Sequence, residues 1–586
     1  MLKVISNNKQ ILALFSIISI YILLSIFATS CANSSIAPTG GAKDSIPPVV
    51  TNMAPQQKST NFNGKEVVLT FNEYVQLKDQ NKNFVISPPL PEKKPVLKIK
   101  GKSVVVSFPS LDENTTYYLD FGASVVDVNE GNPAGYLNFI FSTGSELDTL
   151  MYAGRVVDAY TLEPVEGANV FLYKDDSDSV IYKTNPSALS ITNKEGVYII
   201  KGLKDIKYKL VAITDKNSNM RYETGVEQIA FADSPIQPIV LSENDSIALE
   251  ALPVSNAFME NIRRQGLTEN KRPEERLITL AFNSIYPVIQ SFVIDGINPS
   301  QIITETSRYN DSISYWLVPR TVKDSLSATL IYLKSDSVNN LVPDTVKFKW
   351  NYSKPKPKNK KNTEEEEEDI IPIEPSITAA NTKIIEDGVT LNFKTPLLRV
   401  DPSKISLSVF DDAGKEKIPV KDISFTQDTA NGIRRYKLSA KWKVASKYEL
   451  VILPEAFVDI YSITNDTISK TFETADPEKF GKLNMLFENP DKQYILQLMT
   501  GKNIVQEKII SPKNNKTVFE YLNAGKYKIK VIEDLNTNGE WDTGNYLEKK
   551  QPERTVFLIF SNNDEIIDIK SNWEHDQTID ATNLFK

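Results

Sequence analysis

Residues 67–71, Val-Val-Leu-Thr-Phe, place apolar side chains at every second position, so that Val67, Leu69 and Phe71 share one face. This period of two is that of a β-strand with one buried face. The pattern returns at Val104–Phe108 and Leu137–Phe141, and runs of this kind are separated by Asn, Asp, Gly and Pro. No long stretch keeps an apolar period of 3.6 residues. The sequence therefore predicts an all-β chain of tandem antiparallel β-sandwiches.

The length and charge of the chain narrow its class. Its 586 residues are too many for one hydrophobic core, so several domains are expected. Hydrophobic residues make up 41% of the sequence, a normal fraction for a folded protein. The net charge of −8 arises from 67 basic and 75 acidic residues spread along the chain. Because no basic stripe is present for a phosphate backbone, we expect no nucleic-acid partner.

The two rarest residue types limit the chemistry. Cys31 is the only cysteine and His575 the only histidine. One cysteine cannot form an intrachain disulfide, and one histidine cannot build a zinc site of the usual Cys/His type. His575 stands in a polar stretch, residues 571–576, which we expect to be a solvated tail. We therefore expect a non-catalytic protein, although carboxylate-pair and Ser–Lys mechanisms remain open on composition alone.

The N-terminus has the parts of a secretory signal peptide, residues 1–30. Lys3 and Lys9 precede and flank the start of an apolar run, residues 11–28, and Ala28-Thr29-Ser30-Cys31 follows at its end. The alternative is an uncleaved membrane helix, since about 18 apolar residues nearly span a bilayer. Three serines interrupt the run, however, and no basic cluster follows it. The signal-peptide interpretation is favoured.

Residues 28–31 resemble a lipobox, the cleavage site of bacterial lipoproteins, with Ala28 where leucine is usual. The resemblance implies that Cys31 becomes the acylated first residue of the mature chain, with fatty acids such as palmitate as a membrane anchor. Residues 31–45 would then form a flexible polar tether.

Residues 46–145 form the first predicted module. Five motifs carry its resemblance to a known family: Ile46–Pro48, Val68–Glu73, Asn114–Tyr117, Asp127–Asn132 and Phe139–Gly144. They resemble the SbsA-type bacterial Ig-like domain, which implies a structural or binding module without catalytic residues. Chains with a similar opening and this domain are lipoproteins of the Bacteroidota, and the resemblance implies a protein of that kind.

Residues 150–250 resemble the transthyretin-like, carboxypeptidase-regulatory-like sandwich, on the motifs Gly154–Asp158, Pro164–Ala168, Thr192–Tyr198 and Tyr208–Leu210. An internal repeat follows from the last of these. Tyr208–Leu210, Asp215, Asn217 and Asn219 recur 319 positions later as Tyr527–Ile529, Asp534, Asn536 and Asn538. A weaker echo, with a drifting offset, links the first module to residues 446–474. The chain is therefore expected to repeat an Ig-like plus transthyretin-like pair.

The remaining segments complete the plan. We expect a further sandwich at 272–351, a charged linker at 352–374, an Ig-like sandwich at 375–476 and a second transthyretin-like sandwich at 478–575. The linker contains alternating Lys-Pro from Lys354 and then the acidic run Glu364–Asp369. A solvated spacer between independently folded halves is expected; a docking tail for a partner is the alternative.

One motif could bind a cation. Asp534, Asn536, Asn538, Glu540 and Asp542, with Gly539 at the sixth position, follow the alternating spacing of a calcium loop. Asn545 stands at the twelfth position, where such loops need a bidentate glutamate, and the preceding residues alternate as a strand. The alternative is a turn whose Asp and Asn side chains bond to their own backbone. No cofactor other than this possible calcium is expected.

These features favour an envelope lipoprotein with a structural or binding role. The alternatives are a carbohydrate- or peptidoglycan-binding lipoprotein, which would show a patch of exposed aromatic rings, and a carboxylate-dependent glycosidase. The partner would be another envelope protein or a polysaccharide. Residues 32–35 lack an acidic export tag, so we expect the periplasmic face of the outer membrane, with the cell surface as the alternative.

Overall fold

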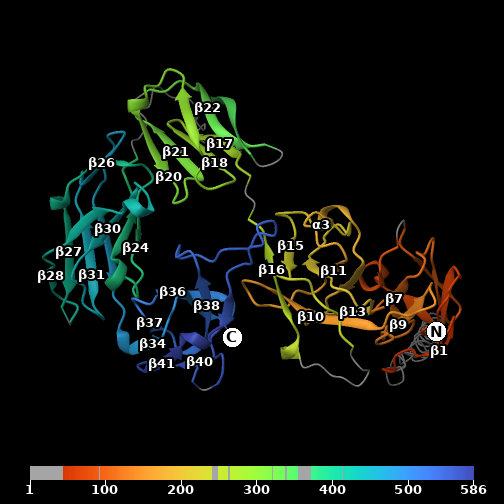
Figure 1. Cartoon of the computed structure of the whole chain (residues 1–586). Helices are drawn as coiled ribbons and strands as arrows, with labels where there is room; N and C mark the ends of the chain where they lie inside the picture. Colours follow the sequence, from red (N-terminus) through yellow and green to blue (C-terminus); the bar gives the residue numbers. More distant parts are fainter. Residues whose placement is uncertain are drawn as a thin grey trace, which may run out of the picture.

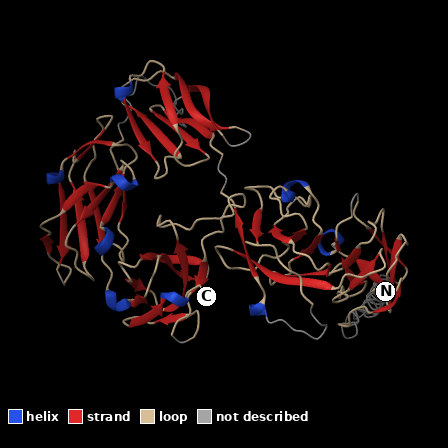
Figure 2. Cartoon of the chain, in the orientation of Figure 1, coloured by secondary structure: helices blue, strands red, loops and turns tan. Residues whose placement is uncertain are grey.

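The computed structural model describes residues 44–90, 93–240, 249–261, 264–319, 321–336, 340–353, 371–411, 413–561 and 563–585. The predicted signal peptide, Cys31 and residues 354–370 of the linker lie outside these ranges. Among the described residues, no helix is both long enough and apolar enough to cross a membrane. Nearly all regular structure is strand, arranged in successive sheets (Figure 2). The all-β prediction is confirmed.

Module 1, residues 46–145, is a sandwich whose core includes the alternating strands at residues 67–71, 104–108 and 137–141. Its sheets have the orders β1-β2-β6-β5 and β4-β7-β9, with the pair β3-β8 beside them. Val67, Leu69 and Phe71 are buried in one core with Phe139 and Phe141. The strands are β1 (Val50–Ala54), β2 (Glu66–Phe71), β3 (Val75–Leu77), β4 (Val85–Ser87), β5 (Val96–Lys100), β6 (Ser103–Ser107), β7 (Thr116–Asp120), β8 (Val125–Asp127) and β9 (Asn138–Ser142).

Modules 3 and 4 share the strand order of module 1. Module 3 has sheets β17-β18-β21-β20 and β19-β22-β23, and module 4 has β24-β25-β30-β29, β28-β27-β31-β33 and the pair β26-β32. The strands of module 3 are β17 (Leu267–Glu274), β18 (Leu277–Phe282), β19 (Ile289–Ile294), β20 (Ile302–Thr306), β21 (Ser312–Leu317), β22 (Ser325–Ser335) and β23 (Leu341–Asn351). Those of module 4 are β24 (Ser376–Thr378), β25 (Val389–Asn392), β26 (Leu397–Val400), β27 (Ile405–Phe410), β28 (Lys417–Pro419), β29 (Ser424–Gln427), β30 (Arg435–Ser439), β31 (Lys447–Ile452), β32 (Phe457–Asp459) and β33 (Ile468–Glu473).

Side chains at matching positions of modules 1 and 4 make the same bonds. The buried Tyr117 hydroxyl accepts the backbone N–H of Asp112 at 2.8 Å, and the buried Tyr448 hydroxyl accepts that of Lys443 at 2.7 Å. The weak sequence echo between these segments thus corresponds to one strand order and one tyrosine contact.

Modules 2 and 5 share a second strand order. Module 2 has one sheet, β12-β11-β14-β15-β16-β10-β13, whereas module 5 has the sheets β36-β35-β38-β39 and β37-β34-β41. In both modules the last strand pairs in parallel with the first, β16 with β10 and β41 with β34. The strands of module 2 are β10 (Leu150–Asp158), β11 (Asn169–Tyr173), β12 (Ala188–Ile191), β13 (Val197–Leu203), β14 (Lys209–Ile213), β15 (Gln228–Phe231) and β16 (Val254–Met259). Those of module 5 are β34 (Gly481–Glu488), β35 (Gln493–Thr500), β36 (Asn503–Ile510), β37 (Lys516–Leu522), β38 (Gly525–Asp534), β39 (Thr555–Phe557), β40 (Ile567–Ile569) and β41 (Glu574–Asp580).

The closing strands extend the expected boundaries. Module 2 continues beyond residue 250 through β16, and module 3 begins with β17 before residue 272. The expectation that His575 lies in a solvated tail is wrong. It lies in β41 opposite Leu483, where its Nε2 accepts the N–H of Lys570 at 3.4 Å, and Ile579 of the same strand enters the core. The sequence did not predict this strand, because its residues are mostly polar and show no alternation with apolar ones.

The modules contact one another beyond their order in the chain. In Figure 1, modules 3 (green), 4 (teal) and 5 (blue) lead back to module 2 (yellow), which also packs against module 1. Arg434 of module 4 binds Glu305 of module 3 at 2.7 Å, and Lys508 of module 5 lies 3.8 Å from Glu386 of module 4. Tyr546 of module 5 is buried in the core of module 2. This contact speaks against the expectation of two independent halves, because Tyr546 of the second half is part of a core in the first.

Candidate functional site

The predicted lipidation site, Cys31, lies outside the described residues. The predicted cation loop lies between β38 and β39, and the structure brings most of its residues together. Both carboxylate oxygens of the buried Asp534 accept backbone N–H groups, from Asn538 at 3.2 Å and Gly539 at 2.9 Å. Gln493 donates to Asp534 as well, at 2.7 Å. The Asn538 side chain accepts the N–H of Glu540 at 2.8 Å.

Asp542 and Glu540 complete the loop in different ways. The Asp542 carboxylate accepts the side-chain amides of Asn536 and Asn538, the second at 3.0 Å. The Glu540 carboxylate instead contacts Tyr309 and Arg308 of module 3. Among the described residues, no group of three or more His, Cys, Asp or Glu side chains is placed to hold a metal ion. In the structure the Asp534 and Asn538 side chains bond to the backbone of their own loop, as they would in the turn that the sequence offers as the alternative.

Module 2 contains the same loop, between β14 and β15. Asp215 accepts the N–H groups of Asn219 at 3.2 Å and Met220 at 2.8 Å, and Glu223 accepts the side-chain amides of Asn217 and Asn219. Met220 and Gly539 occupy the corresponding position, both with positive φ, at 57° and 77°. The repeat that the sequence showed is therefore a repeat of side-chain geometry as well as of residue type.

Each loop is closed by a buried glutamate that the sequence analysis missed. Glu227 accepts the N–H groups of Lys216 at 2.9 Å and Glu223 at 3.0 Å. Glu553 accepts those of Leu535 at 2.8 Å and Asp542 at 3.0 Å. Burial raises the pKa of the Glu553 carboxyl, while the two N–H groups act in the opposite direction. A calcium loop would place its glutamate at the twelfth position, which is Val226 in module 2 and Asn545 in module 5. Glu227 lies one residue beyond that position and Glu553 lies eight residues beyond it, so a search at fixed spacing finds neither.

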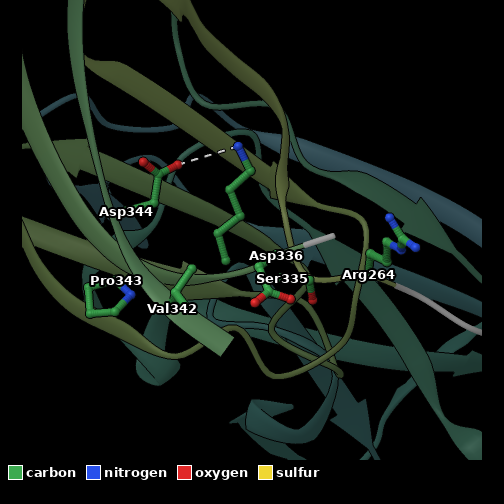
Figure 3. Close-up of a pocket in the computed structure, with 7 residues that line it drawn as sticks. Arg264, Ser335, Asp336, Val342, Pro343 and Asp344 are labelled. Atoms are coloured by element: carbon green, nitrogen blue, oxygen red, sulfur yellow. Dashed lines mark ion pairs between the residues drawn. The ribbon is translucent and has the colours of Figure 1, made fainter. Parts of the chain in front are cut away.

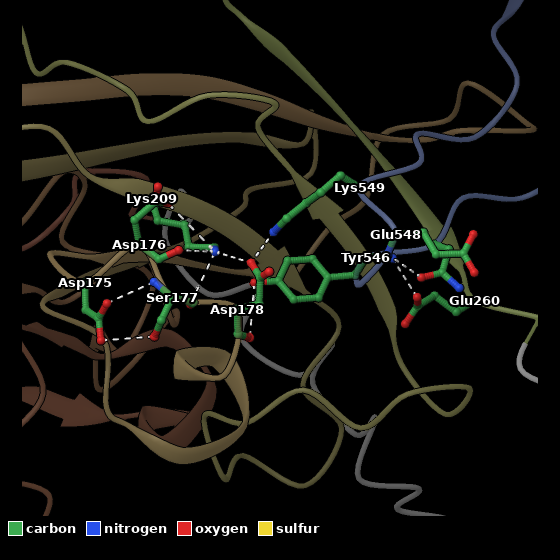
Figure 4. A network of polar contacts seen from close by, with 10 residues as sticks. Asp175, Asp176, Ser177, Asp178, Lys209, Glu260, Tyr546, Glu548 and Lys549 are labelled. Atoms are coloured by element: carbon green, nitrogen blue, oxygen red, sulfur yellow. Dashed lines mark hydrogen bonds and ion pairs between the residues drawn. The ribbon is translucent and has the colours of Figure 1, made fainter. Parts of the chain in front are cut away.

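Modules 2 and 5 meet in a cluster of polar and aromatic side chains around Tyr546 (Figure 4). Tyr546 has no exposed surface and packs edge-on against Phe231, with ring centroids 5.4 Å apart. Its backbone N–H donates to the buried Glu260 at 2.7 Å, and Tyr222 donates to the other oxygen of that carboxylate at 2.7 Å. Lys549 forms an ion pair with Asp178, which also binds Lys209 at 2.9 Å.

A second set of contacts lies on the neighbouring strands. Lys530 of β38 is only 2% exposed, and its Nζ lies 3.3 Å from the ring centroid of Tyr160 and 3.2 Å from the Tyr160 carbonyl oxygen. Burial lowers the pKa of the Lys530 amine to about 8. Thr555 donates to the Ala159 carbonyl at 2.6 Å, and Tyr160 to Gln497 at 3.1 Å. The interface thus joins strands of module 5 to the turn that follows β10, more than 300 positions earlier in the chain.

Two further features of the surface bear on ligand binding. A shallow depression in module 3 lies along β22 and β23, where Lys334 and Asp344 form an ion pair at 3.6 Å beside Ser335, Val342 and Pro343 (Figure 3). Its mostly polar lining differs from the apolar clefts that bind small molecules. The most exposed large aromatics of the described residues are dispersed: Tyr74 and Tyr136 in module 1, Tyr286 in module 3 and Trp573 in module 5. This distribution gives the carbohydrate-binding alternative no specific support.

Residues 44–143 match the family described as bacterial Ig-like domain, which confirms the predicted resemblance of the first module. No curated protein matches the chain. The solved structures with similarity include a tetra-tandem repeat from the extending region of a large adhesion protein (9% identity, 77% of this chain and 96% of that chain covered, TM-score 0.13). They also include domains 1–6 of the surface layer protein SbsC (9%, 90% and 64%, 0.12) and the major pilin subunit BcpA of Bacillus cereus (11%, 73% and 99%, 0.12).

Proposed function

We propose that the chain is a non-catalytic lipoprotein of the bacterial envelope, anchored through Cys31, whose β modules serve a structural or binding role. The main support for the anchor is the position of Cys31 in the sequence. Cys31 follows the apolar run after Thr29 and Ser30, and it precedes Asp44, the first residue that the structure describes, by thirteen positions. A tether of that length spans at most about 45 Å, so module 1 would stay close to the membrane surface.

The structural role is supported by how the modules are joined. The Ser87 hydroxyl of module 1 accepts the N–H of Leu189 in module 2 at 3.0 Å, and Val85 packs against the core of module 2. The contacts among modules 2 to 5 add buried rings and charge-assisted bonds. Such joints favour a fixed arrangement of modules over a flexible string, and a fixed arrangement suits a scaffold that presents a surface to another envelope protein or a polysaccharide.

We place the protein at the outer membrane, on its periplasmic face. The support is the polar sequence after Cys31, Ala32-Asn33-Ser34-Ser35, which has no acidic residue. Adding protease to intact cells tests this placement: protection until the outer membrane is permeabilised is expected, and cleavage in intact cells would move the protein to the cell surface.

The anchor is tested by replacing Cys31 with serine in cells that receive a labelled fatty acid. The wild type should take up the label and fractionate with membranes, because the thiol is the acceptor that the lipobox resemblance implies. Cys31→Ser should lose the label, while Ser25→Ala, which changes the apolar run and leaves the thiol, should keep it. Equal labelling and membrane retention of Cys31→Ser and wild type would overturn the anchor and favour the spanning helix.

A further inference from the structure

The two related loops differ in length at one place. Glu227 follows Asp215 by 12 positions, whereas Glu553 follows Asp534 by 19, although both glutamates make the same pair of backbone bonds. Module 5 therefore contains seven additional residues, 546–552, between equivalent positions of the repeat. The shorter loop of module 2 shows that this fold closes without them.

The additional residues make the central contacts with module 2. Tyr546 belongs to the core cluster that contains Phe231 and Phe258. The Gln551 side chain donates to the Phe231 carbonyl at 3.0 Å and to Asp233 at 2.7 Å, and Lys549 pairs with Asp178. Leu547 and Glu548, between these contacts, are exposed. The segment thus alternates between residues committed to module 2 and residues that face solvent.

Module 2 in turn has a site that fits this segment. Glu260 is only 3% exposed, and one of its oxygens accepts the N–H of Tyr546. Without residues 546–552, the aromatic rings of Phe231 and Phe258 would lose Tyr546 and become accessible to water. A buried carboxylate that binds a backbone N–H from another module is a costly arrangement unless that partner is present.

We propose that residues 546–552 are a latch: an insertion specific to the second repeat that completes the core of module 2 and holds modules 2 to 5 as one closed body. The first half of the chain then depends on a segment about 300 residues further on. This inference stands apart from the proposed anchor, because it concerns only contacts within the folded chain.

The test uses the mature chain with a site for a specific protease inserted between residues 362 and 363. Cutting at this site breaks the covalent link between modules 1–3 and modules 4–5 and leaves only their non-covalent contacts. Three variants are compared with the parent: deletion of 546–552, which restores the loop length of module 2; Tyr546→Ala; and the control Leu547→Ala/Glu548→Ala, which changes only exposed latch residues. The cut proteins are passed through gel filtration over a dilution series.

The cut parent and the control should elute as one species, and the deletion should dissociate at concentrations at least about 30-fold higher, as expected for loss of a buried aromatic anchor. Equal dissociation of parent and deletion would overturn the latch. If the uncut deletion variant does not fold, the test rests on Tyr546→Ala. A dissociation concentration within 3-fold of the parent value overturns the proposal, and a larger increase supports it.

Discussion

Lys530 is a lysine buried between two modules. A lysine with 2% of its surface exposed must lose most of its hydration, and the Tyr160 ring and carbonyl replace only part of it. This loss of hydration lowers the pKa of the amine to about 8, from 10.5. Between these two pH values the unfolded chain binds a proton that the folded chain has released, so the free energy of unfolding rises with pH across this window. Below pH 8 the amine is protonated in both states, and its contribution no longer changes with pH.

This sign gives a prediction for Lys530→Met, which keeps the aliphatic bulk and removes the charge. The free energy of unfolding of the wild type should increase relative to that of the variant as pH rises from 8 to 10.5, by up to about 3 kcal/mol. Urea unfolding of both proteins at intervals across this range measures the difference, in which the titration of all other groups cancels. A difference that stays constant with pH would show that Lys530 is not desolvated in the folded protein.

At the scale of elements, the strands were accessible from the sequence because their faces alternate. Val67, Leu69 and Phe71 predict a buried face, and the structure buries all three. The loop repeat was visible because Asp and Asn recur at a constant offset. β41 was missed, since its polar side chains give no apolar alternation. The latch was missed for a different reason: the run Asn545–Pro552 reads as a polar turn, and Tyr546 finds its partners in a module that local patterns cannot relate to it.

The 534–542 loop gives an element-scale prediction about calcium. Both oxygens of Asp534 already accept N–H groups, and Asp542 binds two side-chain amides, so the loop is satisfied by its own donors. The melting temperature of the mature chain should therefore be the same in millimolar calcium and in chelator. Asp534→Ala should cost about 1–3 kcal/mol in either condition, because it removes the shared acceptor of the Asn538 and Gly539 N–H groups and of the Gln493 side chain. A rise in melting temperature with calcium that disappears in Asp534→Ala would establish a cation site.

At the scale of the whole molecule, the structure joins two halves that the sequence predicts to be separable. The sequence repeat predicts a complete set of strands for each half, and the observed strand orders agree with this prediction. It could not show that the second copy contains a segment that packs into the core of the first. Repeated modules diverge most easily in surface loops, and here one such loop has become part of a neighbouring core.

The central claim is that modules 2 and 5 fold as one cooperative unit, and native-state hydrogen exchange in increasing denaturant tests it most directly. Mass spectrometry of the intact mature chain would follow the amides of β14 and β15 in module 2 and of β35 and β38 in module 5. The latch predicts that the strands of both modules lose protection in a single shared opening at the same denaturant concentration. Strands β14 and β15 that remain protected after β35 and β38 have opened would contradict it, because module 2 would then hold its core without Tyr546.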